Sequence, residues 1–253
     1  MALSGKLAGI IDKVAAELAA CPETIGVFLH GSVLSGTERP DSDVDLLCVT
    51  DADWYSLETR DVEGRKVEIQ RKPLPEIQRE LRQKTLVNNN FPLNTLCDGK
   101  VIWQRGEALS ELIEEAQAMR AAGPPAPTAQ EIYFGRTFFG NRLNEIRHLV
   151  RQGGPRSEGK ARLFADFLFH RAVYAYCKTH RRWSSKFDRV VESLCDEEPE
   201  LRDVYERFLS ARDSARMLEV LEEFLDRVMA PVGWGDGVED SGRIPLQKLA
   251  GRE

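Results

Sequence analysis

The sequence predicts an α+β fold, in which an N-terminal mixed sheet with flanking helices is followed by a C-terminal helical bundle. Two observations predict it. Apolar runs of strand length alternate with helical patterns only in the first 122 residues. After Gly-Pro-Pro-Ala-Pro at 123–127, every remaining pattern is helical. We therefore expect a sheet domain at 1–122, a helical bundle at 128–230 and a loosely ordered tail at 231–253.

The first elements alternate between helix and strand. Apolar residues at helical spacing predict a helix over 7–20, which Pro22 ends. The pattern then predicts a short buried strand at 26–30, a helical turn at 32–35, a polar loop at 37–42 and a second strand at 44–49.

The rest of the sheet domain follows a turn at Asp61-Val-Glu-Gly64. Alternation over 65–71 predicts a strand with Val67 and Ile69 on one face and Glu68 and Gln70 on the other. We expect further elements in the order helix 73–87, hairpin 93–96 with 101–103 around Asp98-Gly99, and helix 107–122. The bundle helices are predicted at 128–151, 159–180, 198–211 and 213–229.

Composition excludes several classes of function. The formal net charge of −6 argues against a duplex nucleic acid as partner, because neutralising many phosphates needs a basic surface. There is no apolar run of about 18 residues and no pattern of a signal peptide, so we expect no membrane partner. The five cysteines form no CxxC pair, which favours reduced thiols and a cytoplasmic location.

Two aspartates, Asp43 and Asp45, stand at the head of the second predicted strand. Residues i and i+2 of a strand point to the same face, about 6.6 Å apart at a rise of about 3.3 Å per residue. Two like charges on one face are unfavourable unless a cation lies between them. Magnesium is the natural cation, since it prefers hard oxygen ligands.

Glu68 joins this cluster if its strand pairs beside the second strand. Three carboxylates can hold two Mg²⁺ ions, which clamp the attacking and leaving oxygens of a phosphoryl displacement. Glu63, in the turn, and Glu58 are the alternatives for the third carboxylate.

Gly31 and Ser32 follow the first predicted strand. A glycine there lets the backbone approach a ligand closely, and the helical turn after it offers N–H groups to phosphate oxygens. The Ser32 hydroxyl adds a donor. One stretch of about 20 residues thus combines a predicted phosphate cradle with a predicted metal site.

These residues resemble the DNA polymerase beta-like nucleotidyltransferase superfamily. Gly31-Ser32 is followed, after ten residues, by Asp43-Val-Asp45-Leu, with Glu68 on a later strand. Ser42 before the aspartates gives the form common in small bacterial members. The order of a sheet domain and a helical domain also resembles the kanamycin and streptomycin nucleotidyltransferases, which would make 1–122 the nucleotidyltransferase domain.

The resemblance implies transfer of a nucleoside monophosphate from ATP or another NTP to an acceptor, with release of pyrophosphate. Gly31 and Ser32 would bind the triphosphate. Asp43, Asp45 and Glu68 would be the catalytic and metal-binding residues, and Glu68 would help to deprotonate the acceptor hydroxyl. Lys186, before a new helix, corresponds to a lysine that reaches the triphosphate in related enzymes. The resemblance also leaves room for a homodimer.

Three functions remain open at this point. The first is transfer of AMP to a small-molecule hydroxyl. The second is AMPylation of a protein, as by an antitoxin, although such proteins are often shorter and lack the helical domain. The third is an inactive nucleotide-binding module, which the presence of all three carboxylates opposes.

Overall fold

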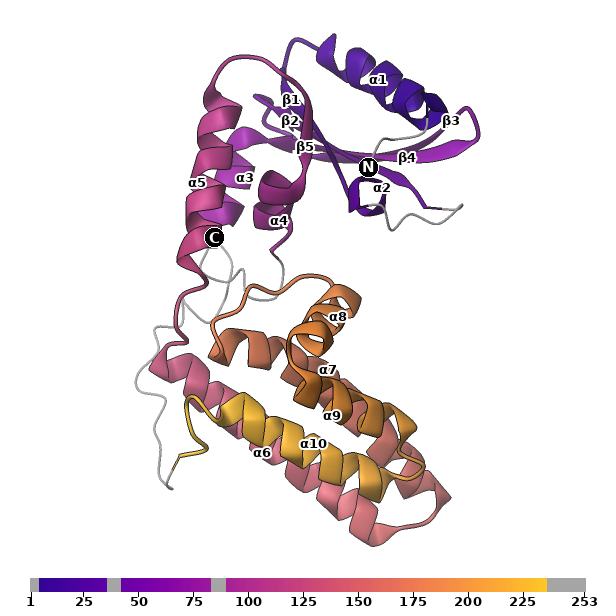
Figure 1. The fold of residues 1–253 in the computed structure, drawn as a ribbon, viewed down its shortest axis with the longest axis vertical. Coiled ribbons are helices and arrows are strands. Elements are labelled where there is room, and N and C mark those ends of the chain that lie inside the picture. Colours follow the sequence, from indigo (N-terminus) through magenta and orange to yellow (C-terminus); the bar gives the residue numbers. More distant parts are fainter. Residues whose placement is uncertain (1–4, 36–41, 83–89, 236–253) are drawn as a thin grey trace. The chain divides into compact units, whose positions relative to one another are not determined.

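The computed structural model describes residues 5–35, 42–82 and 90–235 (Figure 1). The described residues up to Ala122 form one compact unit, and those from Gly123 form another. The first unit combines a mixed sheet with helices and the second is helical, so the α+β fold class is confirmed. None of the described helices is long and apolar enough to cross a membrane.

The first unit is built on a five-stranded sheet with the order β3-β4-β2-β1-β5. Its strands are β1 (Thr24–His30), β2 (Val44–Thr50), β3 (Ser56–Val62), β4 (Arg65–Pro73) and β5 (Lys100–Gln104). β2 and β4 are parallel, whereas the other neighbouring strands are antiparallel. The sheet is therefore mixed, as the sequence predicts, with the edge strand β3 as an additional member.

Helix α1 (Gly5–Ala19) covers one face of this sheet (Figure 1). Its apolar stripe packs into one core with Val44 and Leu46 of β2 and with Val67 and Ile69 of β4. These strand residues alternate with polar ones, so the polar side chains of the same strands lie on the opposite face.

Helices α3 (Leu74–Arg82), α4 (Phe91–Asp98) and α5 (Ala108–Ala122) lie on the other side of the sheet (Figure 1). A short helix, α2 (Ser32–Ser35), follows β1 as predicted. Parts of two expected elements, the loop at 37–42 and the end of the helix at 73–87, lie outside the described residues.

The predicted hairpin around Asp98-Gly99 is wrong, because its first arm is helix α4. Leu93 and Leu96 are both buried at helical spacing, and a proline occupies the first turn. Gly99 ends the helix by donating its N–H to the carbonyl of Thr95, and a Cβ at Gly99 would lie 2.2 Å from that oxygen. The glycine therefore serves a helix end rather than a β-turn.

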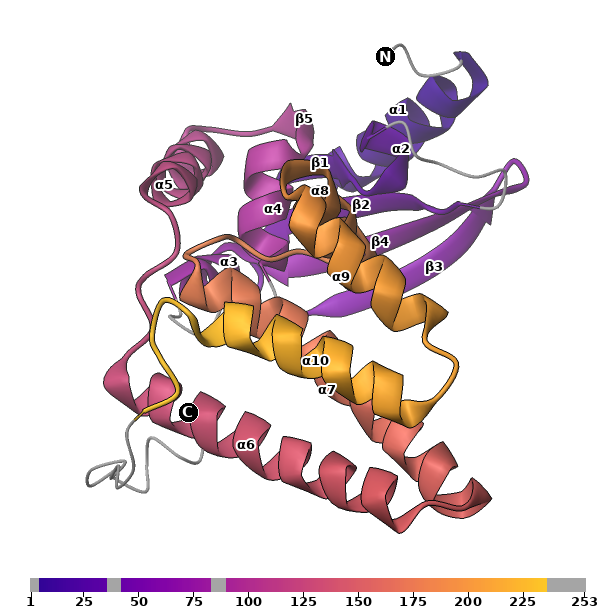
Figure 2. The same cartoon turned by 60° about the horizontal axis from the view of Figure 1, so that its bottom comes forward.

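The second unit contains α6 (Ala129–Gln152), α7 (Pro155–Thr179), α8 (Phe187–Glu197), α9 (Pro199–Ser210) and α10 (Ser214–Met229). The sequence predicts all of these except α8, of which it indicates only the start. Figure 2 shows α6, α7 and α10 side by side, and they share one apolar core. Of the predicted loosely ordered tail, 236–253 lies outside the described residues.

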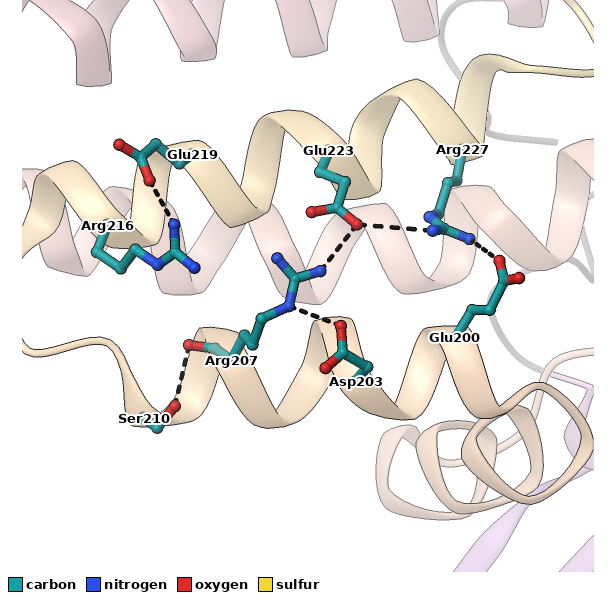
Figure 3. Close-up of polar contacts among 8 residues, drawn as sticks. All are labelled: Glu200, Asp203, Arg207, Ser210, Arg216, Glu219, Glu223 and Arg227. Carbon is teal, nitrogen blue, oxygen red and sulfur yellow. Dashed lines mark hydrogen bonds and ion pairs between the residues drawn. The ribbon is translucent and has the colours of Figure 1, made fainter.

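A chain of ion pairs joins α9 to α10 (Figure 3). Arg207 pairs with Asp203 at 2.7 Å and with Glu223 at 2.8 Å. Arg227 pairs with Glu223 at 3.6 Å and with Glu200 at 2.6 Å. We call these five residues the helical network. Each of its three carboxylates has an arginine partner.

Candidate active site

The candidate site begins where β1 ends, at Gly31. This glycine has a φ of +84°, in the left-handed region that other residues rarely adopt. The turn ends the strand and leads directly into α2, whose first residue is Ser32. The predicted order of strand, Gly-Ser and helical turn is therefore present.

Gly31 lies against the carboxylate of Asp45. A Cβ built on Gly31 would be 2.0 Å from Asp45 Oδ2, which is far closer than atoms can approach. His30, immediately before the glycine, is the antiparallel partner of Asp45. The absence of a side chain at Gly31 therefore leaves the space that the Asp45 carboxylate uses.

The pairing of β2 with β4 brings Asp45 and Glu68 together. The two residues are direct partners in the parallel register, so their Cα atoms are about 4.8 Å apart. Their neighbours Val44 and Val67 are buried under α1, and both acidic side chains lie on the opposite face, half-buried. Asp43 immediately precedes β2 and stands two residues before Asp45, so an extended chain places both side chains on the same face.

The two alternatives for the third carboxylate lie elsewhere. Glu58 is the β3 partner of Ile69, whose side chain is on the α1 side of the sheet, and it pairs with Arg71 at 2.6 Å. Glu63 lies in the β3–β4 turn with a φ of +57° and pairs with Lys13 at 3.6 Å. Among these three, Glu68 is the one beside Asp45. We call Asp43, Asp45 and Glu68 the sheet cluster.

Lys66 also belongs to this site, and the sequence reasoning missed it. It stands two residues before Glu68 on β4, so both side chains lie on the same face. Its Nζ donates a hydrogen bond to Asp43 Oδ2 at 2.5 Å. This bond and the charge of Asp43 raise the pKa of Lys66, and the charges of Glu68 and Asp45 add to the effect. The signal in the sequence was the alternation Lys66-Val-Glu68, which places the lysine on the same face of the strand as Glu68.

The sheet cluster fits magnesium in the type of its donors. Three carboxylates on one face are hard oxygen ligands, and they already attract one cation, the Lys66 ammonium. Within the described ranges, however, no three His, Cys, Asp or Glu side chains are grouped closely enough to hold a metal ion.

Lys186 lies in the second unit, where it precedes the first residue of α8 and is exposed. A lysine at a helix N-terminus is unfavourable for the helix dipole. Its contact with the triphosphate stays a prediction, as do the roles of Gly31 and Ser32 in phosphate binding and of the sheet cluster in catalysis.

Comparison with known proteins places these observations in context. Residues 11–89 match a family model described as the nucleotidyltransferase domain. This segment includes the Gly-Ser pair and all three acidic residues, but not Lys186. No curated protein matches the chain.

Among solved structures, the chain is similar to a nucleotidyltransferase-like protein from Exiguobacterium sibiricum. The two share 16% sequence identity, with a TM-score of 0.50, over 89% of this chain and 78% of that one. At this identity the likeness shows the fold alone. The chain thus contains a segment that matches the nucleotidyltransferase domain, within a fold similar to that of a bacterial nucleotidyltransferase-like protein.

Proposed function

We propose that this protein is an enzyme that transfers a nucleoside monophosphate, AMP from ATP, to a hydroxyl of a small-molecule acceptor. The observation that carries the proposal is the placement of Asp45 directly beside Glu68, on the sheet face where Gly31 and Asp43 also lie. The match of residues 11–89 to the nucleotidyltransferase domain supports it.

In the proposed reaction, the acceptor oxygen attacks the α-phosphorus of ATP. The bond from this phosphorus to the bridging oxygen breaks, and pyrophosphate leaves. Glu68 accepts the proton of the attacking hydroxyl. Two Mg²⁺ ions, when bound, would offset the negative charge of the triphosphate and stabilise the attacking and leaving oxygens.

The chain's own residues would arrange the reactants. Asp43, Asp45 and Glu68 would hold the metal ions. The bare backbone at Gly31 allows close approach of the triphosphate, and the Ser32 hydroxyl would donate to a phosphate oxygen. Lys186 would add a positive charge for the triphosphate.

Charge supports a small-molecule acceptor over a nucleic acid. The formal net charge is −6, and neutralising the phosphates of a nucleic acid would need a basic surface. An acidic site favours acceptors that carry positive charge, such as amino sugars. The helical second unit also counts against a protein AMPylator, since such proteins often lack one.

The test is incubation of the purified protein with ATP labelled at the α-phosphate, Mg²⁺ and a panel of hydroxyl-bearing acceptors, neutral and cationic. We expect release of pyrophosphate and a labelled small product. Label on a protein band instead would support AMPylation. Binding of ATP without pyrophosphate release from any acceptor would contradict the proposal.

A matched pair of variants ties this activity to the site. Asp43→Asn removes one carboxylate of the sheet cluster, and Asp53→Asn makes the same change at an exposed residue beyond the other end of β2. Loss of product with Asp43→Asn but not with Asp53→Asn assigns the activity to the sheet cluster.

A further inference from the structure

We propose that Lys66 is a built-in counter-cation of the sheet cluster, which a divalent metal ion must displace from Asp43 in order to bind. The inference rests on the proposed metal-binding role of Asp43, Asp45 and Glu68. It adds a fourth residue to the site, one that opposes metal binding rather than contributing a ligand.

The backbone fixes where the Lys66 side chain starts. Lys66 is paired with Asp61 of β3 and is held in β4, next to the strand that follows Asp43. Alternation along β4 puts Lys66 and Glu68 on one face, about 6.6 Å apart along the strand. The ammonium therefore starts from the face that carries Glu68 and Asp45, and it bonds to Asp43 at 2.5 Å.

The side chain is free to leave without disturbing the core. The Lys66 side chain is 53% exposed, against 28% for that of Asp43. Its flexible four-carbon stem carries a strongly hydrated point charge, and an exposed pair of this kind is weak. A divalent ion that contacts two or three carboxylates can replace it, while the ammonium moves into water.

Lys66 reduces the charge repulsion within the sheet cluster. Like charges on one face of a sheet repel one another, and this repulsion is unfavourable for the folded sheet. A tethered ammonium offsets part of that repulsion whenever no metal ion is bound. The consequence is weaker metal binding, because the ion must compete with a cation that is always present at high local concentration.

The test is titration of the full-length protein with Mn²⁺, without nucleotide, following free Mn²⁺ by its electron paramagnetic resonance signal. We expect Lys66→Gln to bind Mn²⁺ about two- to fivefold more tightly than wild type, the range that an exposed ion pair allows. Lys66→Arg keeps the charge and should bind Mn²⁺ no more tightly than wild type. Lys13→Gln is the matched control, since Lys13 pairs with Glu63 on the α1 side and its side chain is similarly exposed, at 56%.

A second readout uses the thermal midpoint of each protein with and without Mn²⁺. The rise in Tm on adding Mn²⁺ should be larger for Lys66→Gln than for wild type or Lys13→Gln, because the variant begins with more carboxylate repulsion and binds the ion more tightly. This measurement also confirms that each variant folds.

The outcomes separate this inference from the proposed function. If Asp43→Asn weakens Mn²⁺ binding but Lys66→Gln binds no more tightly than wild type, the role of Lys66 is overturned and the metal site stands. If wild type binds no Mn²⁺ at millimolar concentration and Asp43→Asn changes nothing, the metal site itself is overturned. If Lys13→Gln also binds Mn²⁺ more tightly than wild type, the effect comes from the net charge of the protein, and the inference is overturned.

Discussion

The sheet cluster and the helical network each contain three carboxylates, but their surroundings differ. In the helical network, two arginines link Glu200, Asp203 and Glu223 into one continuous chain between α9 and α10 (Figure 3). In the sheet cluster, Asp43 accepts a hydrogen bond from the exposed side chain of Lys66.

The kind of cation also separates the two regions. An arginine fork is planar and can bridge two acidic groups in a fixed geometry, which suits a permanent contact between helices. A lysine is a mobile point charge that one contact holds. The comparison teaches that the acids joining α9 to α10 are held by arginines with two contacts each, whereas Asp43 in the sheet cluster is held by an exposed lysine that can move away.

The largest expected effect is on the activity of Asp45→Asn. We expect kcat to fall at least about a hundredfold, because even residues that only orient metal ligands cost up to that much when removed. The free energy of unfolding should change little, since asparagine keeps the size of the side chain and one like charge of the sheet cluster is removed. Product formation and urea unfolding check both parts. A strong loss of stability would place the sheet cluster in the same class as the helical network.

Gly31→Ala should come next in size. The substitution puts a Cβ in a left-handed backbone conformation and against Asp45 Oδ2, so we expect about 1–3 kcal/mol of lost stability together with lost activity. Gly64→Ala is the matched control, because Gly64 has a φ of +81° and nothing within 4 Å of the added atom. Urea unfolding of both variants isolates the contact with Asp45. Equal losses would show that this contact contributes nothing.

Arg207→Ala should lower the stability of the protein and leave its activity unchanged, which is the reverse of the pattern expected for Asp45→Asn. Arg207 pairs with Glu223 of α10 and with Asp203 of its own helix α9, and we expect about 1 kcal/mol of lost stability with unchanged kcat. Arg216→Ala, which breaks a single exposed pair with Glu219 within α10, should cost under about 0.5 kcal/mol. Chemical denaturation of the two variants tests the difference. A fall in kcat for Arg207→Ala would contradict a purely structural network.

The smallest effect concerns pH and His180 in the second unit. Burial lowers the pKa of His180, which stacks on Tyr176 at a centroid distance of 3.7 Å. The nearby charge of Glu198 favours protonation and that of Arg182 opposes it. The folded protein thus prefers neutral histidine, and its contribution to stability is full above the unfolded pKa of about 6.5 and declines as pH falls below it.

Urea unfolding at pH 7.5 and pH 5.5 measures this effect. The wild type should lose more stability between these pH values than His180→Gln, which cannot titrate at this position. Equal losses would show that other groups cause the acid sensitivity.

Local patterns predicted much of the geometry of the candidate site. Alternation of Val67 and Ile69 with Glu68 placed the third carboxylate on the correct face, and Gly31-Ser32 marked the turn. The partner strand of β4 could not be read from alternation, because pairing and register depend on contacts distant in sequence. Lys66 was missed since an exposed lysine on a strand has the same pattern as an ordinary solvated residue.

Two elements were harder to predict for different reasons. Strand β3 has only Leu57 and Val62 as apolar residues, and an edge strand with one partner needs few. Helix α4 was mistaken for a strand because Asp98-Gly99 is a strong turn signal, and the helical burial of Leu93 and Leu96 appears only in the folded unit. The acceptor is not encoded in the motif, so sequence reasoning could not name it.

The strand order has a consequence for how the site comes into being. β3 and β4 form a hairpin through the turn at Glu63 and Gly64, and β4 then inserts beside β2, between it and β3. The local hairpin can form early, whereas the parallel pairing of β4 with β2 joins more distant segments and is intrinsically slower. Asp45 and Glu68 therefore meet only when the sheet is completed. A folding intermediate without that step would carry the Gly-Ser turn and two aspartates, yet lack Glu68 beside them.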